Sequence, residues 1–337
     1  MQTLDRPLTT NWSHLAQAVL SGTPVTEQQA LSLLDAPDTE LLAILHAAYQ
    51  IRNQYFGNTV QLYYLMNVKS GLCPEDCHYC SQSKISTADI PKYPMLSTEQ
   101  LLEGAQRAAD AKACTFCIVG SGRGPTDKEV DQVVGAVEQI KASSSIRVCA
   151  CFGILKDGQA ERLKAAGVDR YNHNLNSSEA YHENIVTTHT FQDRVDTVKE
   201  ISGAGISPCS GGIIGLGESP ADAVSLAFSL RDLEVESIPV NFFIPIEGTP
   251  FAHKWHLTPQ YCLKVLAMFR FVNPTREIRI AGGREVHLRS MQPLGLYAAN
   301  SIFVSDYLTT KGQTIEEDFR MIEDMGFEIV GHPDAFK

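Results

Sequence analysis

Three cysteines lie close together in the segment Gly71-Leu-Cys-Pro-Glu-Asp-Cys-His-Tyr-Cys-Ser-Gln82, with the spacing C-x3-C-x2-C. Three thiolates at such a spacing can hold three irons of a 4Fe-4S cube and leave the fourth iron without a protein ligand. An open coordination position is typical of a metal site that reacts rather than one that only supports a fold. Cys73, Cys77 and Cys80 therefore predict a reactive iron-sulfur centre.

A zinc knuckle is the alternative interpretation of these three cysteines. The x3 spacing disfavours it, and no fourth Cys or His follows at the spacing that zinc sites use. His78 lies between the cysteines and is expected to be exposed rather than coordinating.

Four more cysteines fall in or beside segments that read as strands: Cys117, Cys149, Cys151 and Cys209. Side chains alternate along a strand, so Cys149 and Cys151 share one face. If these strands belong to one closed barrel, as the pattern of elements described below indicates, their thiolates can meet at its centre. This predicts a second, buried iron-sulfur centre. The alternative is that each cysteine is buried as a small apolar residue, as we interpret Cys114 and Cys262.

Arg279 lies in the strand-like run Glu277–Ile280. If its side chain shares the interior face, a buried guanidinium needs a partner, which an electron-rich cluster would supply.

Amide side chains also recur at strand spacing. Tyr171-Asn-His-Asn-Leu-Asn176 places Asn172, Asn174 and Asn176 on one face, and Asn241 raises the same question on another strand. Buried amides require partners, so these residues could hydrogen-bond a polar ligand, with a solvated strand face as the alternative. Arg194 could also bind a ligand, but it lies in a helical segment, and an arginine on a helix is usually at the surface. Its role is therefore ambiguous.

The segment Ser210–Glu218 is rich in glycine but does not form a Rossmann fingerprint. At a strand end, glycines would let a flat ligand approach the backbone, and Ile213 and Ile214 could contact an adenine ring. A turn that needs positive φ explains the glycines equally well.

Eight strand-like runs alternate with helical segments, which predicts an α/β fold, a parallel (β/α)8 barrel of the TIM type. The runs are 62–68, 115–119, 146–152, 170–175, 207–214, 237–243, 277–280 and 301–304, and examples of the helical segments are 97–113, 127–141, 158–166 and 192–204. The functional face of such a barrel is the carboxyl end of its strands, and the three-cysteine loop directly follows the first strand. We expect a helical extension over residues 1–58, the barrel over 59–306, and a short tail of polar loop and helix over 307–337.

The composition excludes several classes of function. With 337 residues, 44% of them hydrophobic and 20% charged, the chain is expected to be globular. Its net charge of −11 and lack of basic runs argue against a nucleic-acid partner. No secretory signal or membrane span is evident, and nine cysteines suit metal binding in a reducing compartment, so a cytoplasmic location is expected.

From about Val60 to Gln313 the chain resembles the radical S-adenosylmethionine enzymes and, within them, the biotin synthase family. The similarity lies in the cysteine segment 71–82, the asparagine segment 171–176 and the glycine segment 209–218, and extends through 281–285 and 299–303.

The resemblance implies a set of cofactor ligands. It implies that S-adenosylmethionine binds the unique iron of a 4Fe-4S cluster held by Cys73, Cys77 and Cys80, and that Cys117, Cys149, Cys209 and Arg279 match the ligands of a 2Fe-2S cluster. Asn174, Asn176 and Arg194 match positions that hold S-adenosylmethionine, with Ile213 as a further cofactor contact, and Asn174 and Asn241 lie where the family holds dethiobiotin. Two departures are Asn176, which is Asp in some members, and Cys151, an additional thiol that could support a larger second cluster.

The activity that the resemblance implies is sulfur insertion into dethiobiotin to form biotin, with the sulfur taken from the second cluster, which makes the enzyme a sulfurtransferase. The implied partners are a small electron-transfer protein such as flavodoxin or ferredoxin, the iron-sulfur assembly machinery and a second copy in a homodimer. The alternatives are another radical S-adenosylmethionine barrel enzyme, such as a metallocofactor maturase or amino-acid mutase, an electron carrier without a substrate, or a zinc-stabilised binding module.

Overall fold

The computed structural model describes residues 11–330. The first ten residues of the predicted extension and the last seven of the predicted tail therefore lie outside the described residues.

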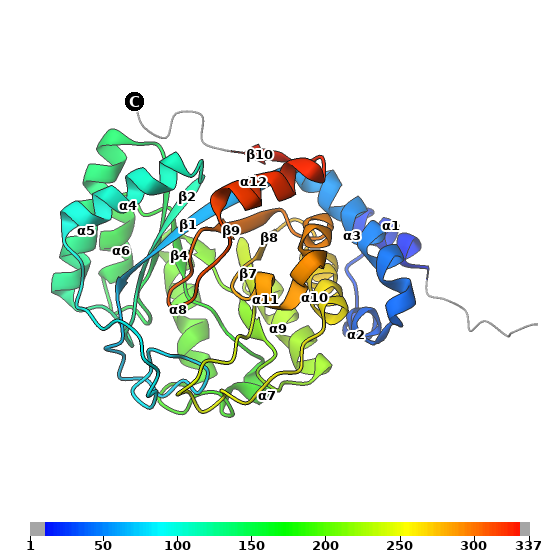
Figure 1. Cartoon of the computed structure of the whole chain (residues 1–337), viewed down its shortest axis with the longest axis horizontal. Coiled ribbons are helices and arrows are strands. Elements are labelled where there is room, and N and C mark those ends of the chain that lie inside the picture. Colours follow the sequence, from blue (N-terminus) through cyan, green and yellow to red (C-terminus); the bar gives the residue numbers. More distant parts are fainter. Residues whose placement is uncertain (1–10, 331–337) are drawn as a thin grey trace, which may run out of the picture.

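Parallel strands form a closed barrel in the centre of the molecule (Figure 1). The sheet runs in the order β1-β2-β3-β4-β5-β7-β8-β9, and β1 also pairs with β9, which closes the ring. The strands are β1 (Thr59–Lys69), β2 (Thr115–Gly120), β3 (Arg147–Cys151), β4 (Arg170–Asn172), β5 (Ser207–Cys209), β6 (Gly212–Ile214), β7 (Ser237–Phe242), β8 (Glu277–Ile280) and β9 (Ser301–Val304). The predicted parallel (β/α)8 barrel is confirmed.

The fifth strand position of the barrel is occupied by two short strands, although the sequence predicts one strand over 207–214. β5 and β6 both pair with β7 and are separated by Ser210 and Gly211. A Cβ atom on Gly211 would lie only 1.9 Å from the carbonyl oxygen of Pro239, so only glycine fits there. The interruption brings the glycine segment against the neighbouring strand at the carboxyl end of the barrel.

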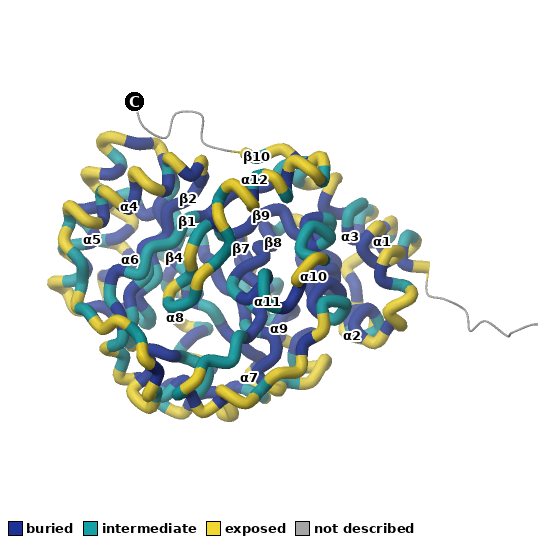
Figure 2. Tube along the Cα trace, in the orientation of Figure 1, coloured by how far each residue is buried: buried dark blue, intermediate teal, exposed yellow. Residues whose placement is uncertain are grey.

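Helices connect the strands and cover the outside of the barrel (Figure 1). They are α4 (Thr98–Asp110), α5 (Asp127–Ser143), α6 (Gln159–Ala165), α7 (Glu179–His182), α8 (Phe191–Gly203), α9 (Pro220–Asp232), α10 (Pro259–Val272), α11 (Arg284–Leu288) and the 3-10 helix η2 (Arg289–Tyr297). Their apolar faces pack on the outward side chains of the strands, and the trace in Figure 2 is buried at the centre and exposed at the rim.

The strands alternate between this outer core and the barrel interior. On β2 and β3, Phe116, Ile118, Val148 and Ala150 belong to the outer core. The intervening cysteines face inward, where Cys117, Cys149 and Cys209 form a separate buried cluster with Tyr63 and Cys114. The period of two therefore places thiols inside and aliphatic groups outside.

The N-terminal helices are α1 (Trp12–Leu20), α2 (Glu27–Asp35) and α3 (Leu41–Phe56), with the 3-10 turn η1 (Asp38–Glu40) before α3. α2 and α3 pack against α10, and α1 packs on α3 (Figure 1). Thr26 and Gln29 form a capping box at the start of α2. Among the leucines of these helices, Leu33, Leu34, Leu41 and Leu45 are buried, whereas Leu42 is exposed.

The C-terminal segment contains the predicted loop and helix, α12 (Ile315–Asp324), and a short strand, β10 (Glu328–Val330), that the sequence did not indicate. β10 pairs in parallel with the start of β1, from Thr59 to Gln61. Three residues, two of them exposed, carry no period that could be detected in advance.

Between residues 11 and 330, no helix has the length and apolar character needed to cross a bilayer.

Arg52 on α3 ties the N-terminal helices to the barrel. Its buried guanidinium donates to the carbonyl oxygens of Ala299 (3.0 Å) and Thr59 (2.6 Å), and also to that of Gly57. Charge-assisted hydrogen bonds to buried carbonyls are costly to remove, because the acceptors lose their partners.

We expect Arg52→Ala to lower the free energy of unfolding by about 3 kcal/mol. Urea denaturation followed by circular dichroism measures this loss. Arg107→Ala is the control, because Arg107 on α4 is half exposed and its ion pair with Glu103 spans 3.9 Å. Equal small effects of the two substitutions would contradict the role assigned to Arg52.

Candidate active site

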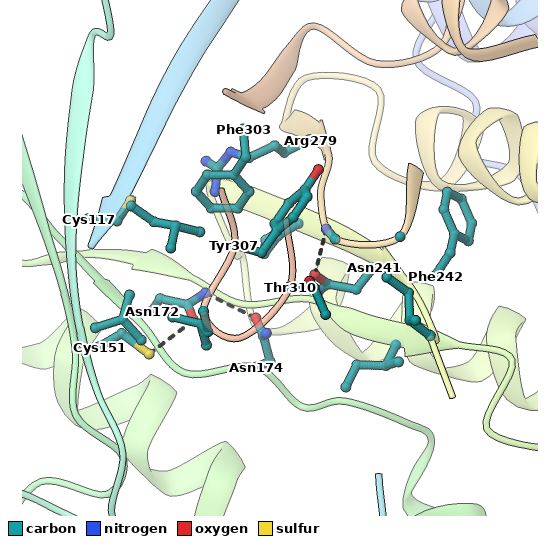
Figure 3. Close-up of a pocket in the computed structure, with 18 of the residues that line it drawn as sticks. Cys117, Cys151, Asn172, Asn174, Asn241, Phe242, Arg279, Phe303, Tyr307 and Thr310 are labelled. Atoms are coloured by element: carbon teal, nitrogen blue, oxygen red, sulfur yellow. Dashed lines mark hydrogen bonds between the residues drawn. The ribbon is translucent and has the colours of Figure 1, made fainter. Parts of the chain in front are cut away.

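A cavity of about 340 Å³ opens inside the barrel at the carboxyl ends of the strands. Figure 3 shows side chains from opposite sides of the barrel converging on it. The sequence-predicted residues that line the cavity are Cys117, Cys149, Asn174, Asn176, Cys209, Ile213, Asn241 and Arg279, together with Cys151 and Asn172. Cys73, Cys77, Cys80 and Arg194 do not line it.

Three cysteines from three different strands meet at one side of the cavity. Cys117 on β2 is the cross-strand partner of Cys149 on β3, and Cys149 lies within hydrogen-bonding reach of both Cys117 and Cys209. The hydrogen bond with Cys117 and burial raise the pKa of Cys149 well above its usual value. Such thiols become thiolates only where a metal or a fixed cation compensates the charge.

Arg279 supplies a cation at this cluster. It is 1% exposed, and its Nη1 lies 3.8 Å from the sulfur of Cys209. Its Nη2 donates to Ser237 (2.5 Å) and Glu277 (2.7 Å), whereas its Nε is buried and has no hydrogen-bond partner among the described residues. Three converging thiols and an incompletely satisfied guanidinium fit an iron-sulfur group at this place.

Cys151 shares the inward face with Cys149, as the alternation along the strand predicts. Its thiol donates to Oδ1 of Asn172 at 3.4 Å, and Nδ2 of Asn172 lies 3.3 Å from the sulfur of Cys209. Burial raises the pKa of Cys151 to about 12. One amide thus separates the additional thiol from the three-cysteine cluster.

The other two cysteines lie outside the cavity. Cys114 is buried just before β2, where Nη2 of Arg147 lies 2.9 Å from its sulfur, and Cys262 is buried on α10. Both pack within cores, although Cys114 belongs to the barrel interior rather than to a helical surface.

The loop between β1 and α4 carries Cys73, Cys77 and Cys80, and acidic residues between them fix its conformation. Glu75 pairs with His189 and with Arg123 (3.2 Å). Asp76 accepts from the backbone N–H groups of Thr187 (2.9 Å) and Thr188 (3.2 Å). The segment after α7 therefore holds the loop at both carboxylates.

The thiols of this loop are set in an apolar environment. Cys77 and Cys80 pack with Ile185, Val186 and Phe251. Burial raises the pKa of Cys77 to about 12 and that of Cys80 to about 11, so a bound metal must displace the protons.

Within residues 11–330, no three His, Cys, Asp or Glu side chains converge closely enough for one metal ion. A single tetrahedral ion draws its thiolates to about 2.3 Å from one centre. In a multi-iron cluster each thiolate binds a different iron, so the sulfurs are more widely spaced. The lack of a one-ion site among the described residues is therefore compatible with a multi-iron cluster at Cys73, Cys77 and Cys80.

Asn176, Arg194 and Tyr79 join the cysteine loop to the asparagine segment. Arg194 on α8 is buried, which resolves its ambiguity, and its Nη1 donates to the carbonyl oxygen of Asn174 at 2.7 Å. With its amide oriented to satisfy all its neighbours, Asn176 accepts from both terminal nitrogens of Arg194 (3.2 Å) and from the hydroxyl of Tyr79. Nε of Arg194 is buried without a partner among the described residues.

Asn172, Asn174 and Asn241 hold the cavity wall with part of their hydrogen-bonding capacity. The side-chain oxygen of Asn174 accepts from Asn172 (3.0 Å) and from the backbone N–H of Gly211 (3.0 Å). Asn241 bridges the carbonyl of Gly212 (3.1 Å) and the N–H of Gly282 (3.0 Å), as Figure 3 shows in part. Nδ2 of Asn172 is fully used, because it also faces the carbonyl oxygen and the sulfur of Cys209. The amide nitrogens of Asn174 and Asn241 each have two hydrogens, so both residues keep a donor beside the cavity.

A need for positive φ explains part of the glycine segment, and close packing against Pro239 and Leu226 explains another part. Gly215 and Gly217 have φ of 101° and 104°, a backbone conformation that favours glycine over residues with a side chain. Gly211 and Gly212 have ordinary φ but leave no room for a Cβ atom, and Ile213 beside them lines the cavity.

Sequence reasoning assigned the loop after β9 to the tail and missed its place in the site. Tyr307, Leu308, Thr309 and Thr310 line the cavity, and the hydroxyl of Thr309 lies 3.0 Å from that of Ser81 in the cysteine loop. Their position directly after the last barrel strand was the available signal, because loops at that end build the active face.

Comparisons with known proteins agree with this arrangement. The chain matches the model of the Radical SAM superfamily over residues 67–230 and that of the Biotin and Thiamin Synthesis associated domain over 239–328. The structure resembles methylornithine synthase (PylB), with a TM-score of 0.83, 19% identity and coverage of 94% of this chain and 97% of that one. The FeFe-hydrogenase maturase HydG from Carboxydothermus hydrogenoformans aligns with a TM-score of 0.81, 17% identity, and coverage of 96% and 80%. At these identities the structural likeness concerns the fold.

The barrel and its three-cysteine loop define the chain as a radical S-adenosylmethionine enzyme. Members of this superfamily use S-adenosylmethionine and a 4Fe-4S cluster. Biotin synthase of Anoxybacillus flavithermus is 58% identical over 97% of this chain and 99% of that protein. Those of Geobacillus kaustophilus and Bacillus subtilis strain 168 are 60% and 57% identical over 95% and 94% of this chain, and 96% and 95% of those proteins. The chain belongs to the biotin synthase family.

Three buried histidines surround Arg194. His173, His182 and His189 have pKa values lowered by burial and, secondly, by the charge of Arg194, and that of His182 falls to about 4. They are neutral in the folded protein. Unfolding exposes them to water, where their usual pKa is about 6.5.

Stability should therefore be complete above about pH 6.5 and decline as the pH falls toward 4, because the unfolded chain then binds protons that the folded chain does not. We expect His182→Gln to reduce this loss between pH 7 and pH 5 by about 2 kcal/mol. Urea unfolding of the metal-free protein at several pH values measures it. His253→Gln, at an exposed position, is the control; an unchanged pH dependence in the His182 variant would contradict the prediction.

Proposed function

We propose that this chain is a sulfurtransferase that converts dethiobiotin to biotin with S-adenosylmethionine, a 4Fe-4S cluster and an auxiliary 2Fe-2S cluster. When bound, these groups supply the removal of hydrogen from unactivated carbon and the sulfur that replaces it. The family membership and the groups lining the cavity support the proposal. The protein's own tasks are to bind, orient and exclude water.

Cys73, Cys77 and Cys80 would hold the 4Fe-4S cluster. Glu75 and Asp76 lie between Cys73 and Cys77, and their contacts fix the conformation of the loop. A fixed loop favours binding of the cluster. The apolar contacts of Cys77 and Cys80 with Ile185, Val186 and Phe251 would limit the access of water to the cluster.

Asn174, Asn176, Arg194 and Ile213 would bind S-adenosylmethionine between that loop and the cavity. Nε of Arg194, which has no partner in the part of the chain that the structure describes, and the contact between Asn176 and Tyr79 support this position. Ile213, beside glycines that leave no room for side chains, offers an apolar surface to the adenine ring. Asn at 176 would hydrogen-bond a ribose hydroxyl without the charge of the Asp found in some members.

Cys117, Cys149, Cys209 and Arg279 would hold the 2Fe-2S cluster. The observation that carries the proposal is the meeting of three thiols from three strands with a buried, partly unpartnered guanidinium inside the same cavity. Cys151 would remain an accessory thiol, because Asn172 lies between it and Cys209.

Dethiobiotin would occupy the cavity between the two clusters. Asn174 and Asn241 would orient its polar ring through the amide donors that the backbone leaves available. Phe242, Phe243 and Phe303 would cover its carbon chain and exclude water from the reacting carbons.

We propose that the chain has three parts: a helical extension over 1–58, the catalytic barrel over 59–306 and a tail over 307–337. The loop 307–310 would nevertheless act with the barrel, because it lines the cavity.

The proposed partners are a small electron-transfer protein such as flavodoxin or ferredoxin, the iron-sulfur assembly machinery and a second copy in a homodimer, in the cytoplasm. The chemistry calls for the first two, since the first cluster needs an external electron and the second cluster is consumed.

A radical S-adenosylmethionine enzyme with another substrate is the nearest rival. A metallocofactor maturase or amino-acid mutase would not require sulfur at the base of its cavity. The interior thiols and Arg279 favour sulfur insertion.

The proposal predicts that anaerobically reconstituted protein, supplied with dethiobiotin, S-adenosylmethionine and a reductant, forms biotin and 5′-deoxyadenosine. Mass spectrometry measures both products. A sample replete with both clusters that forms neither would contradict the proposal.

Cys209→Ala separates the two clusters. We expect it to retain cleavage of S-adenosylmethionine and to lose biotin formation at least 100-fold, because only the auxiliary cluster loses a ligand. Cys262→Ala, at a buried thiol outside the cavity, is the matched control. Normal biotin formation by the Cys209 variant would contradict the role of that cluster as sulfur donor.

A further inference from the structure

Glu277 lies on β8, inside the barrel and 4% exposed. Five neighbouring groups donate hydrogen bonds to its carboxylate: the hydroxyls of Tyr63 (2.8 Å), Ser237 (3.2 Å) and Ser301 (2.9 Å), Nη1 of Arg170 (2.7 Å) and Nη2 of Arg279 (2.7 Å). A buried carboxylate so fully satisfied has one fixed orientation.

This carboxylate determines which atoms of Arg279 face the cysteines. Glu277 and Ser237 occupy Nη2, and the guanidinium carbon lies 3.3 Å from the ring centroid of Tyr63. Nη1 is left 3.8 Å from the sulfur of Cys209, and Nε has no hydrogen-bond partner within residues 11–330. Figure 3 shows Arg279 beside Phe303 at this wall of the cavity.

Glu277 also offsets positive charge at this place. It accepts hydrogen bonds from the guanidinium groups of both Arg279 and Arg170 at 2.7 Å, so it forms ion pairs with both as a carboxylate. Its single negative charge stands against two guanidinium groups. Without it, both cations would act on the cysteine cluster unopposed.

We propose that Glu277, held in place by Arg170 and Tyr63, is a positioning residue that orients Arg279 toward the auxiliary cluster and lowers that cluster's reduction potential. None of these three residues was identified from the sequence as part of the site. The inference rests on the proposed function, since it requires an auxiliary cluster at Cys117, Cys149 and Cys209.

Glu277→Gln tests the proposal, because it keeps the shape of the side chain and removes its charge. Reduction potential depends on net charge and hydrogen bonding around a cluster. We expect reduction of the auxiliary cluster to become at least tenfold more favourable, which is a midpoint about 59 mV higher for one electron. We also expect its iron to be lost to a chelator at least fivefold faster. Spectroelectrochemical titration and timed chelation of the holoprotein measure both.

Tyr63→Phe is a second variant that keeps the ring under Arg279 and removes one donor to Glu277. It should shift both quantities in the same direction by a smaller factor, and it remains informative if Glu277→Gln does not fold. Asp318→Asn is the matched control, because Asp318 on α12 is a fully buried carboxylate paired with Arg284 at 2.6 Å and does not line the cavity.

A midpoint and a chelation rate unchanged in both variants, or changed equally in Asp318→Asn, would overturn the positioning role while leaving the proposed function intact. Wild-type protein that binds only the 4Fe-4S cluster would instead overturn the proposed function, and this inference with it.

Discussion

The burial of charge inside the barrel is the constraint on which the rest of the structure depends. Arg279 is almost completely buried beside three thiols, and a guanidinium in such a place is tolerated only with compensating partners. Glu277 provides one partner and the cysteine cluster is positioned to provide the other. The closed ring of strands makes this possible, because it brings residues far apart in sequence to one dry interior.

The two groups of cysteines are positioned by different parts of the fold. The three-cysteine loop is anchored through its own Glu75 and Asp76 to the segment after α7, whereas the interior cysteines are held by strand register. Asn176 and Arg194 connect the two regions. A ligand bound between them would be fixed by polar groups at its ends and enclosed by aromatic rings, an arrangement suited to a reactive species that water must not reach.

Much of this was predictable from the sequence, because spacing carries the information. The period of two placed Cys149 and Cys151 on one face, and alternating runs predicted the barrel. The gap between β5 and β6 depends on a backbone contact between Gly211 and Pro239, and the loop at Tyr307–Thr310 depends on how the chain folds back over the cavity. The role of Glu277 could not be predicted from the sequence, because it depends on residues from other strands that no local pattern brings together.

Mössbauer spectroscopy of protein reconstituted with 57Fe tests the central claim most directly, since it counts the clusters and their types before any turnover. The account predicts two iron environments, a 4Fe-4S cluster and a 2Fe-2S cluster in equal amounts, with the 2Fe-2S signal lost when Cys117, Cys149 and Cys209 are all replaced by Ala. A single 4Fe-4S signal in the wild-type protein, or a 2Fe-2S signal that persists without these cysteines, would contradict it.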